Sequence, residues 1–103
     1  MTRLAVDDVL VVASDTARGQ VEGLLRRGLG DAAATVEDRT DELAMLSLQG
    51  PASRAVLEAL APEEDWGTEA FAFRDVRRVR VSGSDVLAAR ITYVGELGWE
   101  LYV

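Results

Sequence analysis

Residues 90–100 hold the side chains best suited to chemistry in this 103-residue chain. Tyr93 and Glu100 flank a connection that contains Gly95 and Gly98, two glycines three residues apart. Glycine lets the backbone turn sharply and approach a ligand closely. A carboxylate can accept two parallel N–H bonds, so Glu100 suits a guanidine-like edge, such as that of an amino-pyrimidinone ring, beside the aromatic wall of Tyr93. The alternative is an ordinary hairpin turn, with Tyr93 in the core and Glu100 on the surface.

A second candidate segment runs from Leu46 to Pro51. A strand that passes through glycine into a helix N-terminus can present backbone amides to an anion. Plain capping explains the same pattern, with Gly50 as the N-cap and Pro51 at the first helical position, and the residue types favour it. The pattern assigns no role to Gln49.

The composition excludes several kinds of site. All 11 basic residues are arginine, and Lys, His and Cys are absent. There is therefore no thiolate, imidazole or Schiff-base amine, and no His or Cys ligand for a metal. The acidic runs Asp7–Asp8 and Glu63–Asp65 are typical of solvated turns, so we expect no metal site.

Charge and hydropathy restrict the partners. With 18 acidic residues the net charge is −7, which argues against nucleic acid, because such partners need clustered cations. No apolar run approaches the roughly 20 residues that span a membrane, and we expect no membrane partner. The lack of cysteine is consistent with a cytoplasmic location.

Hydrophobic periodicity predicts the first half of the chain. Val9–Ala13 is expected to be a buried strand, and a helix should follow from Ser14–Asp15 to Gly28 or Gly30. Its predicted core stripe is Ala17, Val21, Leu24 and Leu25. A second strand, at an edge, is expected over Thr35–Thr40.

The second half begins with an alternating strand over Glu42–Leu48, and Pro51 opens a helix that Pro62 ends. The predicted core stripe of that helix is Ala52, Val56, Leu57 and Leu60. Glu63–Glu69 should form an acidic surface loop.

Beyond Phe71, apolar residues recur at every second position. Ser82–Asp85 is the turn of a hairpin whose return strand is Val86–Tyr93. The last strand, Trp99–Val103, places Trp99, Leu101 and Val103 on one face and Glu100 and Tyr102 on the other. This order of elements predicts an α+β fold of the ferredoxin-like kind, a mostly antiparallel sheet with two helices on one face.

Two motifs together carry a family resemblance. Leu46–Ser53 (LSLQGPAS), followed by Arg90–Val103 (RITYVGELGWELYV), resembles the folate-binding domain of the aminomethyltransferase (glycine-cleavage T-protein) family. The pattern Tyr-x-Gly-Glu-x-Gly-aromatic-Glu is that family's pterin-site signature. Val94, Leu97 and Trp99 favour the folate arm of sarcosine and dimethylglycine dehydrogenases. The resemblance covers residues 1–103, which would form part of such a domain.

The resemblance implies roles for individual residues. Glu100 would grip the pterin amino and ring N–H groups, Tyr93 would lie beside the ring, and Gly95 and Gly98 would shape the loop. Glu96 matches the motif without a ligand role. The catalytic aspartate of the family would fall before Met1, so no residue of this chain is expected to be catalytic, and Asp7 and Asp8 do not replace it.

The implied activity is transfer of a one-carbon unit from an aminomethyl or iminium donor to tetrahydrofolate, giving 5,10-methylenetetrahydrofolate. We expect the chain to be a fragment of such a protein, with weak or no folate binding and no catalysis on its own, and with folate as its partner. An alternative is a non-catalytic module that kept the fold and self-associates through an edge strand or an apolar face. We expect a homo-oligomer, because the face that the rest of the parent protein would cover remains apolar. A third possibility is a plain structural domain whose loop glycines serve only the turn.

Overall fold

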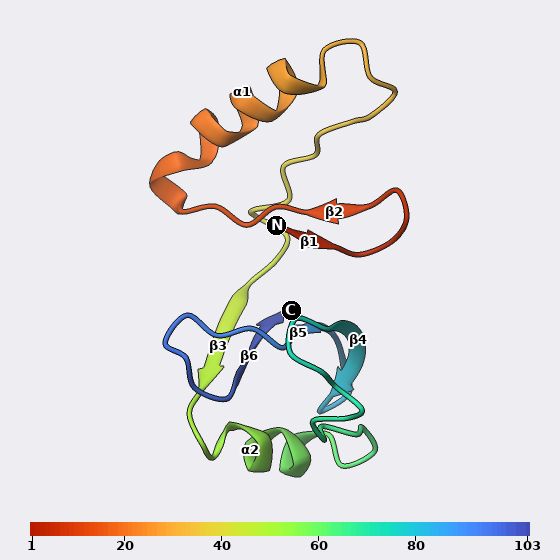
Figure 1. Cartoon of the computed structure of the whole chain (residues 1–103), viewed down its shortest axis with the longest axis vertical. Helices are drawn as coiled ribbons and strands as arrows, with labels where there is room; N and C mark the ends of the chain where they lie inside the picture. The colour runs from red at the N-terminus through yellow and green to blue at the C-terminus, as the bar shows by residue number, and fades with distance from the viewer. The chain divides into compact units, whose positions relative to one another are not determined.

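The structure is a computed structural model that describes all 103 residues. The chain divides into two compact units, Met1–Thr40 and Asp41–Val103 (Figure 1). The short strands β1 and β2 and helix α1 belong to the first unit, and the larger sheet and α2 belong to the second.

The first unit is a small hairpin followed by a helix. β1 (Thr2–Arg3) pairs antiparallel with β2 (Val9–Leu10), and a 3₁₀ turn at Asp15–Ala17 leads into α1 (Arg18–Leu29). The predicted helix is therefore confirmed, with a later start. The predicted buried strand over Val9–Ala13 extends only to Leu10, because β1 is two residues long and offers no further pairing partner. It is also not buried, since Val9 is 48% exposed.

Two other expectations for this unit are wrong. Thr35–Thr40 is not a strand, because its backbone binds side chains and does not pair with another strand. Arg26 Nη2, for example, donates to the Val36 carbonyl at 2.9 Å. The predicted core stripe of α1 is not buried, and Leu24 is 55% exposed. A unit of 40 residues has too little volume to exclude water from a helix face.

The second unit is a four-stranded antiparallel sheet with one helix. Its strand order is β3 (Met45–Gln49), β6 (Gly98–Tyr102), β5 (Ser84–Ala89) and β4 (Val76–Val81). The β4–β5 hairpin is confirmed, and it turns through Ser82 and Gly83, whose φ angles of 49° and 88° are typical of a tight two-residue turn. α2 (Ser53–Leu60) follows β3 in the chain.

The core of this unit lies on the sheet face that carries Trp99. Trp66 and Phe71 stack at 5.7 Å between ring centroids, and both meet Trp99 edge-on at 5.8 and 6.2 Å. Such pairs are stabilising because ring edges are positive and ring faces negative. Trp66 is thus a core residue, although its acidic segment was expected to be a surface loop.

Helix α2 buries a stripe that shares only Leu57 with the one predicted. Ser53, Leu57 and Ala61 are buried, at intervals of four residues, whereas Val56 and Leu60 are 42% and 47% exposed. The helix also begins at Ser53 rather than Pro51, with Ala52 as its N-cap. That later start does not move the helix face, which is set by the aromatic core beneath it.

The α+β class with antiparallel sheets is confirmed. The finer ferredoxin-like arrangement, with two helices on one face of one sheet, stays a prediction, since α1 and α2 belong to different units.

Candidate functional site

Glu100 lies in the middle of β6, on the face of the sheet opposite Trp99. It pairs with Ser47 on β3 and with Ala89 on β5, and residues in register share one face. The side chain is half-buried. Flanking strands therefore hold this carboxylate on a rigid element, as a positioned hydrogen-bond acceptor requires.

Tyr102 is the direct partner of Glu100. Its phenol donates a hydrogen bond of 2.6 Å to Oε2 of Glu100. Burial of Tyr102, then the bond to Glu100 and its charge, raise the pKa of the phenol well above its ordinary value of 10.0. The phenol therefore stays a donor at neutral pH. The alternation of β6 predicts that both side chains share a face, but not that they meet.

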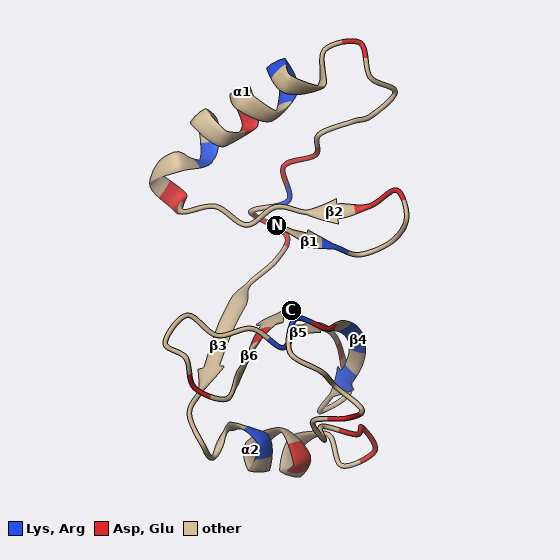
Figure 2. Ribbon diagram, viewed as in Figure 1, with Lys and Arg blue, Asp and Glu red and all other residues tan.

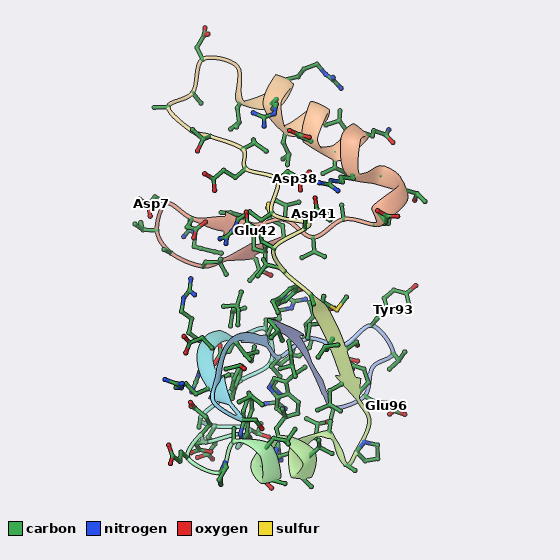
Figure 3. All side chains as sticks on the ribbon, turned by 180° about the vertical axis from the view of Figure 1, so that it is seen from behind. Asp7, Asp38, Asp41, Glu42, Tyr93 and Glu96 are labelled. Carbon is green, nitrogen blue, oxygen red and sulfur yellow. The ribbon has the colours of Figure 1, made fainter.

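Tyr93 lies in the loop Arg90–Leu97 between β5 and β6, because the return strand ends at Ala89 rather than at Tyr93. Its side chain is fully exposed and points away from the sheet (Figure 3). The alternative of a hairpin with Tyr93 in the core is wrong, since Tyr93 is fully exposed, while Glu100 is half-buried rather than at the surface. The structure does not bring the Tyr93 ring to Glu100.

Gly95 and Gly98 are explained by two different features of the structure. Gly95 has φ of +79°, a conformation that side chains disfavour, and the space where its Cβ would stand is open. Gly98 is not in that region. A Cβ built on Gly98 would overlap with Oε1 and Cδ of Gln49, so the glycine gives room to the Gln49 side chain rather than serving a turn.

The segment after β3 binds the far end of the same loop. The Gly50 N–H donates to the Leu97 carbonyl at 2.7 Å, and Ser53 Oγ donates to the same carbonyl at 3.2 Å. The Gly50 amide is thus occupied and unavailable to an anion. Gly50 is also not the N-cap, and its φ of +113° explains the glycine.

The acidic runs form no comparable site. The structure contains no group of three or more acidic side chains placed to hold a metal ion. No helix has the length and apolar character to cross a membrane.

Comparison with known proteins identifies the family. The family model described as the GCVT N-terminal domain matches residues 1–103, and the chain therefore belongs to this family. This confirms the resemblance carried by the Leu46–Ser53 and Arg90–Val103 motifs.

Similar proteins include oxidising and transferring enzymes. The 4-methylaminobutanoate oxidase (formaldehyde-forming) of Paenarthrobacter nicotinovorans is 37% identical over 102 residues, 99% of this chain and 12% of that protein. Human mitochondrial sarcosine dehydrogenase is 46% identical over 66 residues, 64% of this chain and 7% of the relative. The aminomethyltransferase of Chlorobium limicola is 48% identical over 67 residues, 65% of this chain and 18% of the relative. The chain thus matches less than a fifth of each of these three proteins.

Proposed function

We propose that this chain supplies the pterin-binding part of a folate-dependent aminomethyltransferase-type protein. The observation that carries the proposal is Glu100, a half-buried carboxylate held mid-strand beside a glycine-containing loop, in a chain of the GCVT N-terminal domain family. Tetrahydrofolate would be the co-substrate, and no residue of this chain is assigned a catalytic role.

The donor–acceptor chemistry of Glu100 fits a pterin. A carboxylate offers about four lone-pair sites, and the Tyr102 phenol takes one of them. The remaining sites can accept the amino and ring N–H groups of the pterin as a parallel pair. Charge-assisted bonds of this kind fix orientation as well as affinity. Tyr93, fully exposed on the adjoining loop, is free to lie against the bound ring.

The reaction proposed for the whole protein is one-carbon transfer. Two tetrahydrofolate nitrogens form C–N bonds to the carbon of an iminium donor, the carbon–nitrogen bond of the donor breaks, and the amine leaves with a proton released. The product is 5,10-methylenetetrahydrofolate. Attack by a weakly basic nitrogen depends on orientation, to which Glu100 contributes by holding the pterin ring, and needs no His or Lys.

Calorimetric titration with a stable reduced folate tests the proposal. We expect weak binding by the folded chain that is lost in Glu100→Ala and weakened at least tenfold in Glu100→Gln, as for loss of a charged acceptor. Asp85→Asn is the matched control, because it removes one negative charge from an exposed position on β5. A folded chain that binds no reduced folate, or binds it equally well in all variants, would contradict the assignment.

A second candidate function is self-association through β3. This edge strand carries no charged residue, whereas the other edge, β4, carries three arginines, Arg77, Arg78 and Arg80 (Figure 2). Charges on an edge strand discourage pairing with another chain, and β3 lacks them while exposing Met45 and Leu46.

Sedimentation distinguishes the two functions. A tight dimer that Leu46→Lys dissociates, with no effect of folate on its stability, would favour the interaction module. A monomer that binds folate favours the pterin site.

A further inference from the structure

The side-chain amide of Gln49 lies between the strand that carries Glu100 and the loop that carries Tyr93. Gln49 is the last residue of β3 and pairs with Gly98, the first residue of β6. Its Nε2 donates to Ser47 Oγ at 3.2 Å and, across the sheet edge, to the Ile91 carbonyl at 3.4 Å. A carbonyl only accepts, so this contact fixes which end of the amide faces the loop.

The other end of the amide packs on Gly98. A Cβ atom at position 98 would overlap with Oε1 and Cδ and would lie 2.8 Å from Nε2. Oε1 is buried and has no hydrogen-bond partner. The pair Gln49–Gly98 is therefore a close-packed contact, and a side chain at position 98 would displace the Gln49 amide from its place.

The residues that follow Gln49 secure the opposite end of the loop. Leu97 accepts from the Gly50 N–H and from the Ser53 hydroxyl, as described above. Residues 49–53 thus hold the loop at Ile91, near its start, and at Leu97, its last residue. Between these points Tyr93 is fully exposed, so few other contacts fix it.

We propose that Gln49 is a positioning residue, which holds the Ile91–Leu97 loop next to the strand that carries Glu100 and so fixes one wall of the proposed pterin site. This inference rests on the proposed function, since it assigns the residue that sets the geometry of that site. Gln49 itself need not contact the ligand.

Two measurements on the full chain test the role. The first is amide hydrogen exchange of residues 91–97, with the β5–β6 ladder as internal reference. The second is affinity for a stable reduced folate. Gln49→Met keeps the length of the side chain and removes its donor, so we expect loop exchange to rise and affinity to fall, each about five- to tenfold. Gln20→Met, the same substitution at an exposed position of α1, is the control and should change neither.

A double-mutant cycle isolates the contact with Gly98. Gly98→Ala should displace the Gln49 amide and reproduce the loss seen in Gln49→Ala. In the double variant the second change should add almost nothing, because the displaced amide is already absent. Additive effects would show that position 98 acts independently of Gln49 and would overturn the proposal.

The remaining outcomes separate this role from the function itself. Unchanged loop exchange in Gln49→Met overturns the proposal, whatever the affinity. A rise in loop exchange with unchanged folate affinity also overturns the proposal. If the unmodified chain binds no reduced folate, the proposed function fails and Gln49 loses its role in binding, while a rise in loop exchange would still identify it as the residue that holds the loop.

Discussion

The Tyr102 phenol and the Glu100 carboxylate, two residues apart on β6, are joined by a hydrogen bond of 2.6 Å. One oxygen of Glu100 is thereby held from within its own strand, and the carboxylate is orientated before any ligand arrives. A group that is already orientated loses less freedom on binding, which is the general basis of preorganised recognition.

Removal of the phenol oxygen should destabilise the second unit. Tyr102→Phe leaves Oε2 of a half-buried carboxylate without its donor, and bonds to charged groups contribute about 1.5–3 kcal/mol. We expect the free energy of unfolding to fall by about 1–2 kcal/mol because Glu100 retains some access to water. Urea unfolding followed by tryptophan fluorescence measures it, since Trp66 and Trp99 both lie in this unit. Tyr93→Phe, at a fully exposed position, should change it by less than about 0.5 kcal/mol, and equal losses in the two variants would contradict this account.

The Tyr102–Glu100 pair should also make the stability of the second unit fall at alkaline pH. Because folding raises the pKa of Tyr102 above its ordinary value of 10.0, the folded state holds the proton more tightly than the unfolded chain. The stabilisation is therefore complete below pH 10 and is lost as the pH rises toward the folded-state pKa. Unfolding curves collected from pH 8 upward should show a decline beginning near pH 10 that is smaller in Tyr102→Phe. A decline of the same size in both proteins would assign it to other groups.

Asp38 should make the stability of the first unit fall at acidic pH. The Thr40 hydroxyl, the Thr40 backbone N–H and Arg18 bind its carboxylate and lower its pKa from 3.8 to about 2. A lowered pKa stabilises the folded form above pH 4, and this contribution disappears as the pH falls through about 2. We expect the Asp38 carboxyl to titrate near pH 2 by NMR and the Thr40 amide to exchange faster in Asp38→Asn. Titration of Asp38 near its ordinary value would exclude the bond to the Thr40 hydroxyl in solution.

Local periodicity predicts the elements of the second unit well and those of the first less well. The β4–β5 hairpin and β6 follow from a period of two over consecutive residues, and the turn at Ser82–Gly83 from residue types that tolerate positive φ. The strand expected over Thr35–Thr40 has the right residues but no partner to pair with. Whether a strand forms depends on such a partner, which its own sequence does not specify.

The environment of Glu100 could be predicted only in part. The alternation of β6 places Glu100 and Tyr102 on one face, and the glycine spacing marks the loop. The contact between Gln49 and Gly98 depends on the register of β3 against β6, 49 residues apart in sequence, and no local pattern reports it. For the same reason Trp66, within an acidic stretch, gives no local sign that it is buried against Trp99.

The two candidate stripes of α2 can be distinguished by one pair of substitutions at adjacent positions. Leu57 is fully buried against the aromatic core, so Leu57→Ala removes packed atoms and leaves a cavity, at a cost of about 2–5 kcal/mol. Val56, the next residue in the stripe predicted from sequence, is 42% exposed, and Val56→Ala should cost less than about 1 kcal/mol. Alanine has the higher helix propensity, which reduces the second loss further. Urea unfolding by tryptophan fluorescence compares the two variants directly. Losses of similar size would mean that Val56 also packs in the core, as the periodicity alone predicts, and that the helix face seen in the structure is wrong.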